Sequence, residues 1–236
     1  MSVASKSVAI ITGASMGFGR AFAEELAGDG WDLVIDARHQ HPLEVAAARL
    51  RKHGGTVMAV AGDVTDPDHR RAVVDAATAL GPLRLVVNNA STLGASPLPR
   101  LSEVPLDTLT AVYATNVVAP LALVQLALPA LTEAGGTVVD ITSDAAVEGY
   151  EGWGGYGSSK AALDQLGNVL AAEHPDLRVY SFDPGDMRTQ MHQDAFPGED
   201  ISDRPEPEGV APVLRRLVAD SPPSGRYRAA DLRSPA

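Results

Sequence analysis

The sequence predicts an α/β fold, a doubly wound parallel sheet of about seven strands with helices on both faces, forming a single domain over residues 1–236. Short apolar runs alternate along the chain with longer helical patterns, as in successive βαβ units. Glycines cluster at residues 13–19, directly after the first apolar run. No linker and no repeat of about 20–50 residues divides the chain, so we expect one domain.

The expected strands are short apolar runs, which are typical of strands buried on both faces of a parallel sheet. They cover residues 8–12, 33–35, 56–60, 83–87, 137–141 and 177–182. The expected helices cover residues 20–27, 43–53, most of 106–131, and 156–173. Glycine pairs follow the first two helices and end them. Another helix opens at Asp66-Pro67, where a capping residue precedes a proline.

Residues 190–209 break this alternation. They contain three prolines and six acidic residues, with Arg204 as the only lysine or arginine. Two interpretations stay open for this segment. It is either a solvated surface loop or a mobile lid over a substrate site, a role that long loops in compact α/β domains often have.

The composition excludes several classes of function. Nineteen Lys and Arg against thirty Asp and Glu give a net charge of −11, which argues against a nucleic-acid or anionic-membrane partner. The absence of cysteine excludes disulfides and a cysteine nucleophile, and the six histidines have no metal-ligand spacing, so we expect no metal site. Residues 1–11 resemble no secretory leader, and the most apolar stretch, 116–131, falls short of about 20 apolar residues. We therefore expect a cytoplasmic protein.

The glycine-rich segment is Thr12-Gly13-Ala14-Ser15-Met16-Gly17-Phe18-Gly19, and it joins the first expected strand to the first helix. Glycines at such a turn allow a sharp bend, a close approach of the backbone to a pyrophosphate, and close packing of the helix on the sheet. The free N–H groups and the positive end of the helix favour an anion. A tight connection without a ligand is the alternative interpretation.

The Thr-Gly-x3-Gly-x-Gly spacing is similar to the turn of the short-chain dehydrogenases/reductases. Further motifs of that family follow in order: Asp63-Val64, Asn88-Asn89-Ala90, Asn116, Ser143, Tyr156-x3-Lys160, and Pro184-Gly185 with Thr189. The resemblance covers about residues 8–189. It implies a Rossmann-type fold with a cofactor half at about 1–140 and a catalytic helix and substrate loop at about 141–236. It also implies a homodimer or homotetramer. The chain departs from the family at Ser91, where Gly is usual.

The resemblance implies a nicotinamide cofactor. The residues that it assigns to cofactor binding are Gly13, Ser15, Gly17, Phe18, Gly19, Arg38, Asp63, Val64, Asn89, Ala90, Tyr156, Lys160, Pro184, Gly185 and Thr189. An acid after the second strand would select a ribose 2′-OH, whereas an arginine favours a 2′-phosphate. In the alignment that we favour, Ala37 replaces the acid and Arg38 is the phosphate-binding base, which predicts NADP(H) rather than NAD(H). Asp36 is one position earlier, so a one-residue shift would reverse this choice.

Tyr156 and Lys160 are four residues apart, so they project from one face of the expected helix. Tyrosine has an ordinary pKa of about 10, and a nearby ammonium group is expected to lower it toward the working range. The resemblance adds Ser143, which would hold the substrate oxygen, and Asn116, which would bind a water that relays protons through Lys160. It also assigns Lys160 to the nicotinamide ribose and Thr189 to the carboxamide.

The expected function is the reversible, NADPH-dependent reduction of a ketone or aldehyde, with Tyr156 as the proton donor. The expected partner is a small carbonyl or alcohol substrate, recognised by residues 91–104, 144–155 and 190–209. Three alternatives stay open: a catalytically silent NADP-binding sensor or scaffold, an NAD-dependent alcohol dehydrogenase of the same fold, and a dehalogenase or epimerase. The glycine-rich turn argues against a dehalogenase, which needs no nucleotide.

Overall fold

The computed structural model describes residues 6–232 and has one sheet of seven parallel strands in the order β3-β2-β1-β4-β5-β6-β7. The predicted fold class is confirmed. The strands are β1 (Val8–Ile11), β2 (Asp32–Ala37), β3 (Val57–Ala61), β4 (Leu83–Asn88), β5 (Thr137–Ile141), β6 (Arg178–Asp183) and β7 (Gly225–Arg228). The ends of the predicted domain, residues 1–5 and 233–236, lie outside the described residues.

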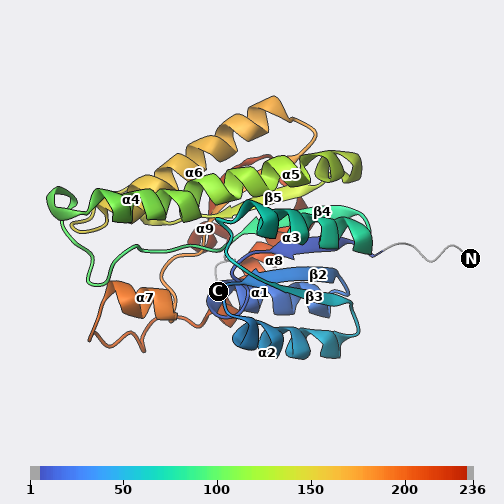
Figure 1. Ribbon diagram of the computed structural model, residues 1–236, viewed down its shortest axis with the longest axis horizontal. Helices are drawn as coiled ribbons and strands as arrows, with labels where there is room; N and C mark the ends of the chain where they lie inside the picture. Colours follow the sequence, from blue (N-terminus) through green and yellow to red (C-terminus); the bar gives the residue numbers. More distant parts are fainter. Residues whose placement is uncertain (1–5, 233–236) are drawn as a thin grey trace, which may run out of the picture.

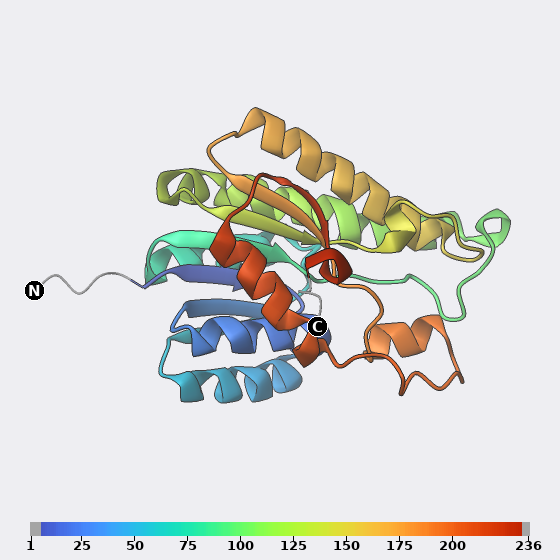
Figure 2. The same ribbon diagram turned by 180° about the vertical axis from the view of Figure 1, so that it is seen from behind.

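Helices cover both faces of the sheet (Figures 1 and 2). They are α1 (Gly17–Gly28), α2 (Gln40–Leu50), α3 (Pro67–Leu80), α4 (Leu106–Tyr113), α5 (Ala119–Ala134), α6 (Gly154–Glu173), α7 (Gln190–Ala195), α8 (Ala211–Asp220) and α9 (Ala229–Leu232). Successive residues of β1 point to opposite faces. Ala9 and Ile11 belong to the core cluster formed with α1, α2 and α8, whereas Val8 and Ile10 belong to the one formed with α3 and α5.

The strand order reverses between β1 and β4. From β1 the chain winds outward to β2 and β3, and it then returns to the other side of β1 to build β4 to β7. The loops that leave β1 and β4 therefore diverge at the carboxyl edge of the sheet, where parallel α/β folds bind ligands. Figure 1 shows α7 and its flanking loops at this same end of the molecule.

The expected helix over 106–131 is two helices joined by a π-helical turn at Ala114–Val118. Figure 1 shows α4 and α5 as one continuous rod. Among residues 6–232, the stretch Leu106–Ala134 is long and apolar enough to cross a membrane, a criterion that the core helix of a soluble protein also meets. The stretch is longer than the sequence suggested, and Leu123, Ala127 and Leu131 are buried in the core.

Two local predictions have clear outcomes. Asp66 caps α3 as predicted, because its carboxylate accepts a hydrogen bond of 2.9 Å from the main-chain N–H of Asp68. The prediction of a loop throughout 190–209 is wrong at both ends, because residues 190–195 form α7 and Pro207–Gly209 forms a 3-10 turn. The Thr189 hydroxyl accepts a hydrogen bond from the N–H of His192 and so begins α7.

Candidate active site

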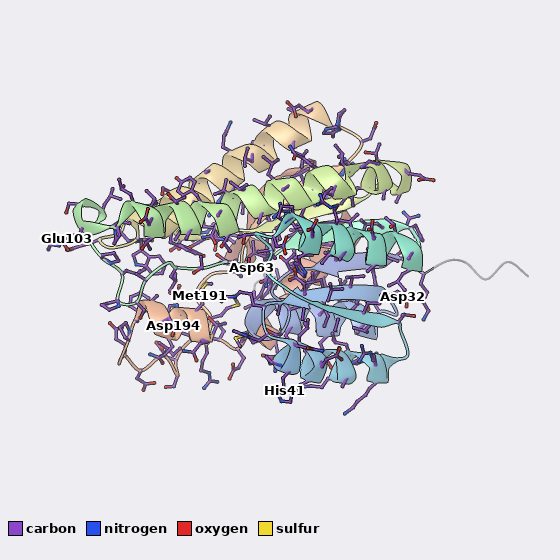
Figure 3. All side chains as sticks on the ribbon, viewed as in Figure 1. Asp32, His41, Asp63, Glu103, Met191 and Asp194 are labelled. Carbon is purple, nitrogen blue, oxygen red and sulfur yellow. The ribbon has the colours of Figure 1, made fainter. Side chains whose placement is uncertain are left out.

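A cavity of about 1210 Å³ opens at the carboxyl edge of the sheet, where β1 and β4 diverge. It is lined by every predicted cofactor-binding or catalytic residue except Gly19 and Asn116. Figure 3 labels two of its lining residues, Asp63 after β3 and Met191 on α7. The cavity thus joins the glycine-rich turn, the second and third strand ends, and the face of α6 that carries Tyr156.

The glycine-rich turn is built to present main-chain N–H groups. Gly17 has a φ of +57°, in the left-handed region, and it begins α1, whose first turn has no side-chain cap. The N–H groups in the first turn of α1 are therefore open to an anion. A Cβ on Gly19 would lie 2.4 Å from Nδ2 of Asn89, so this glycine allows α1 to pack close to the loop after β4. Gly19 supports the turn rather than lining the cavity.

The two loops of the crevice are tied together. Asn89 donates from Nδ2 to the carbonyl oxygens of Thr12 at 2.8 Å and Gly13 at 3.2 Å, and the Thr12 hydroxyl accepts from the N–H of Ala90 at 3.0 Å. The Phe18 ring is buried against Phe182, with ring centroids 6.0 Å apart, so a ligand contact at Phe18 falls to its main chain. The turn is thus held rigid before any ligand arrives.

Asp36 and Arg38, the two residues between which the cofactor preference was predicted to turn, differ in burial and bonding. Asp36 is 2% exposed, and its carboxylate accepts hydrogen bonds from the N–H of Gly13 at 2.8 Å and from Nε2 of His69 at 3.0 Å. Burial raises the pKa of Asp36 despite these bonds. Asp36 and Arg38 both line the cavity, but Asp36 is buried beneath the turn with its carboxylate bonded to the protein, whereas Arg38 is exposed.

Arg38 also differs from the other arginines that line the cavity. Arg20 forms an ion pair with Glu208 at 2.7 Å, and Arg188 forms one with Glu206. Within residues 6–232, Arg38 has no carboxylate within ion-pair distance. Its charge is thus available to an anionic ligand at the end of β2.

Asp63 and Val64 form the opposite wall. The Asp63 carboxylate accepts hydrogen bonds of 2.8 Å from the N–H and the hydroxyl of Thr65, and these bonds, with the charge of Arg38, hold the pKa of Asp63 below its usual value. The uncapped first turn of α1, the exposed Arg38 and the wall formed by Asp63 and Val64 fit a dinucleotide that carries a phosphate on its adenosine ribose.

The catalytic pair lies deeper in the cavity. Lys160 is 2% exposed, its Nζ donates to the carbonyl oxygen of Ile141 at 2.7 Å, and it lies 5.5 Å from the centroid of the Tyr156 ring. Burial lowers the pKa of Lys160 to about 8, against the opposing charges of Asp140 and Asp164.

The expectation that Lys160 lowers the pKa of Tyr156 is wrong. Burial raises the pKa of Tyr156 above its ordinary value, and the charges of Asp183 and Asp144 act in the same direction. The nearby Ser91 side chain acts in the opposite direction. Tyr156 is therefore held protonated, which is the state that a proton donor needs.

Ser143 lines the same cavity as Tyr156, but its hydroxyl is engaged. It donates to the Asp144 carboxylate at 2.9 Å and accepts from the N–H of Ala145 at 3.2 Å, which starts the 3-10 turn at Asp144–Ala146. To hold a substrate oxygen, the hydroxyl proton must turn away from Asp144.

Asn116 lies in the π-helical turn, fully buried and away from the cavity lining. Its side chain accepts from the N–H of Thr92 at 2.9 Å and from the Ser91 hydroxyl at 3.1 Å, and it donates to the carbonyl oxygen of Thr92 at 2.9 Å and to the Ser159 hydroxyl at 3.0 Å. These bonds use both amide protons, so a relaying water would have to bind the main chain. The side chain instead locks the loop after β4 to α6.

The substrate end of the cavity is aromatic. Trp153 packs on Tyr156 and on Phe196, with ring centroids 5.6 Å and 5.9 Å apart, and His192 packs on Phe196 at 4.9 Å. The hydroxyl of Ser96 donates to the carbonyl oxygen of Asp194 at 2.6 Å, which ties the loop after β4 to α7. Residues 190–196 thus cover the cavity beside the catalytic tyrosine, as the lid interpretation requires; their mobility stays a prediction.

The remaining predicted residues line the cavity from two segments. Ser15 lines it from the glycine-rich turn, and Pro184 and Thr189 line it from the segment after β6. The N–H of Gly185 donates to the Asp183 carboxylate at 3.0 Å, which shapes this segment. Ser143, Tyr156 and Lys160 complete the set, so the structure brings the predicted site residues together at one cavity, with Gly19 and Asn116 supporting it from behind.

Sequence reasoning missed four residues of the site. Ser91 was visible only as a departure from the usual glycine, and Asp144 only as a neighbour of Ser143. His69 and Arg226 lie far along the chain from the groups that they contact, and no motif singles them out.

A family model described as short chain dehydrogenase matches residues 7–200 of this chain. The chain belongs to this family. Rat sepiapterin reductase is 36% identical over 199 residues, covering 79% of this chain and 76% of the relative. Serine 3-dehydrogenase of Rhizobium radiobacter is 31% identical over 216 residues, covering 90% and 84%. The crystal structure of an alcohol dehydrogenase from the archaeon Thermococcus sibiricus, complexed with 5-hydroxy-NADP, matches with a TM-score of 0.86 at 26% identity, covering 98% and 99%. The chain is thus a member of an oxidoreductase family.

Proposed function

We propose that this short-chain dehydrogenase is an NADP(H)-dependent oxidoreductase that reduces a ketone or aldehyde to an alcohol, and that the reaction is reversible. One observation carries the proposal: the buried Tyr156 and Lys160 face the same cavity as an uncapped glycine-rich turn and the unpaired Arg38. Carbonyl reduction without a thiol or a metal needs a bound dinucleotide as hydride donor and a nearby acid as proton donor.

When bound, NADPH would supply the hydride that reduces the carbonyl carbon. The N–H groups at the start of α1 would bind the pyrophosphate, and Arg38 would bind the 2′-phosphate. Lys160 would donate a hydrogen bond to the nicotinamide ribose, and it keeps a positive charge beside Tyr156. The Tyr156 hydroxyl donates its proton to the substrate oxygen, while the Ser143 hydroxyl holds that oxygen in place. One hydride on carbon and one proton on oxygen complete the alcohol, and oxidation of an alcohol runs the same steps backward.

The preference for NADP(H) is supported by the inward position of Asp36 and the exposed position of Arg38. The name of the Thermococcus sibiricus structure points in the same direction, because that protein was crystallised with a derivative of NADP. The name sepiapterin reductase supports the direction of reduction, whereas serine 3-dehydrogenase names the reverse reaction. A small apolar or aromatic carbonyl substrate fits the wall formed by Trp153.

Replacement of Tyr156 by Phe tests the mechanism. The variant keeps the ring and its contact with Trp153 but has no proton to donate, so we expect turnover to fall about 10²- to 10⁴-fold. NADPH binding, measured by its fluorescence, should change less than about twofold, because the hydroxyl alone is lost. The assay is NADPH oxidation over a panel of ketones and aldehydes, with NADH in parallel. Turnover near that of the wild type in Tyr156→Phe would sink the mechanism.

The same panel separates the catalytic proposal from a silent NADP-binding sensor. Stoichiometric NADPH binding without turnover by the wild type, over the whole panel, would favour the sensor. A homodimer or homotetramer and a cytoplasmic location stay predictions. Exposed apolar side chains on the π-helical turn, α5 and α6, namely Val118, Leu126 and Val169, agree with self-association.

A further inference from the structure

Arg226 lies on β7, at the edge of the sheet, and joins three separate parts of the proposed active site (Figure 2 shows β7 at this edge). Its Nη2 donates to the carbonyl oxygen of Ser143 at 2.9 Å and to the Asp183 carboxylate at 3.0 Å. Its Nε donates to the Asp164 carboxylate at 3.2 Å. One guanidinium therefore bonds to β6, α6 and the turn after β5.

Each of these partners carries a different part of the site. Ser143 is the residue proposed to hold the substrate oxygen. Asp164 lies one helical turn after Lys160 on α6. Asp183 ends β6, and its other carboxylate oxygen accepts the N–H of Gly185 at 3.0 Å, in the segment proposed to meet the nicotinamide. A rigid fork of donors is suited to holding three such acceptors in fixed relation.

The charge of Arg226 also matters, because its two acidic partners are mostly buried. The side chains of Asp183 and Asp164 are 4% and 12% exposed. Oδ1 of Asp164 is buried and accepts no hydrogen bond from residues 6–232. Buried carboxylates without a counter-ion are costly. Their charges act on the catalytic pair: the charge of Asp183 helps to raise the pKa of Tyr156, and the charge of Asp164 opposes the lowering of the pKa of Lys160 by burial.

We propose that Arg226 is a positioning residue of the reductase, which aligns the Ser143 strand end, the nicotinamide segment and the catalytic helix through one guanidinium. The inference rests on the proposed function. It goes beyond the Tyr-Lys-Ser set, because Arg226 lies outside the part of the chain that the family model matches, residues 7–200. Nothing in the strand sequence Gly-Arg-Tyr-Arg distinguishes it.

Two variants separate the hydrogen-bond geometry of the Arg226 guanidinium from its positive charge. Arg226→Gln removes the charge and most of the donors, whereas Arg226→Lys keeps the charge on a compact group that cannot reach all three acceptors. Arg228→Gln is the matched control, because Arg228 lies on the same strand two residues later and is exposed. For each protein the assay measures kcat, KM for NADPH, the pH profile of kcat/KM, and the thermal midpoint with and without NADP+.

For Arg226→Gln we expect kcat to fall at least about tenfold and KM for NADPH to rise about threefold, since the adenosine contacts lie at other strand ends. We also expect the alkaline limb of the profile to move upward by about half a pH unit or more. The groups that face Lys160 are Asp140 from β5 and Asp164 from α6, with Tyr156 and the Ile141 carbonyl beside it. Removing the counter-ion of Asp164 leaves more negative charge near the ammonium group, which favours its charged form.

In Arg226→Lys the alkaline limb of the kcat/KM profile should stay at the same pH, and kcat should fall at least about threefold. If Arg226→Gln does not fold, the Lys variant decides alone, and a kcat within twofold of the wild type overturns the proposal. A purely structural role would lower the thermal midpoint and the active fraction without moving the limb, and that result also overturns it. So does a kcat for Arg226→Gln within about twofold of Arg228→Gln.

The proposed function can fail separately. If the wild type turns over no carbonyl substrate, the proposed reaction is refuted. The effect of NADP+ on the thermal midpoint then still tests the role of Arg226. In that case NADP+ should raise the thermal midpoint of Arg226→Gln by less than it raises that of Arg228→Gln, because the Asp183-Gly185 contact has lost its support. Equal rises in the two variants overturn the positioning role.

Discussion

Replacing Arg38 by Ala should convert a preference for NADPH into indifference between the two nicotinamide cofactors. Arg38 follows β2 and is exposed at the cavity, while the neighbouring acid, Asp36, is turned inward by Gly13 and His69. The variant therefore removes the side chain proposed to bind the 2′-phosphate, while the Asp36 carboxylate stays bonded to Gly13 and His69. NADPH should lose affinity, and NADH, which has no 2′-phosphate, should not.

The structure sets the size of the effect. A hydrogen bond to a charged group contributes about 1.5–3 kcal/mol, and exposure to solvent reduces this figure. Arg38 is exposed, so we take about 1–2 kcal/mol, which corresponds to about a 5- to 30-fold rise in KM for NADPH. The effect should weaken with added salt, because the Debye length falls from about 10 Å at 0.1 M to about 3 Å at 1 M.

The assay is steady-state oxidation of NADPH and of NADH at several salt concentrations, with one carbonyl substrate held at saturation. Lys52, which is exposed in the 3-10 turn that follows α2, gives the control variant Lys52→Ala. KM for NADH should stay within about twofold of the wild type in both variants. Equal rises in KM for the two cofactors, or no rise for NADPH, would refute the reasoning from Arg38.

Two further predictions concern buried titratable groups. His69→Leu takes away one of the two donors that hold Asp36 inward, so the ratio of kcat/KM for NADPH to that for NADH should fall at least about threefold. His69→Gln keeps a donor nitrogen and should retain the ratio; loss of the ratio in both variants, or in neither, would contradict this role. Burial lowers the pKa of Lys160 to about 8, so kcat/KM for reduction should fall as the pH rises through about 8 and the ammonium loses its proton. Lys160→Arg stays charged, and its profile should lack this limb; a limb that persists in the variant would assign it to another group.

The sequence predicted most of the fold because the strands are uniformly apolar. Six of the seven strands appear close to their expected positions, as with Thr137–Ile141, which forms β5 as predicted. The seventh strand was counted but not located, since Gly225–Arg228 has no apolar run and only one neighbouring strand. None of the four residues of β7 is fully buried, so hydrophobicity carries little information about this strand.

The sequence also predicted which residues meet, because each motif directly follows a strand. Parallel strands bring their carboxyl ends to one edge, and Arg38, Asp63 and Ser143 meet there for that reason. What it did not predict is how polar side chains are shared. The Ser143 hydroxyl donates to the carboxylate of its neighbour Asp144, and the Asn116 amide donates to Ser159 and Thr92 within the protein. Such partners depend on side-chain rotamers and on contacts between distant segments, which no spacing encodes.

The charge balance explains why so few groups should decide cofactor recognition. The chain carries a net charge of −11, and two of the arginines at the cavity are already neutralised by Glu206 and Glu208. The attraction for an anionic dinucleotide must therefore come from Arg38, Lys160 and the N–H groups at the start of α1. Arg38 follows β2, Lys160 lies on α6 and the N–H groups begin α1, and the reversal of strand order between β1 and β4 opens the crevice that they share. We therefore expect affinity for the cofactor to depend on this strand order, and the choice between NADPH and NADH to depend on the exposed Arg38 rather than on Asp36, which is buried and bonded within the protein.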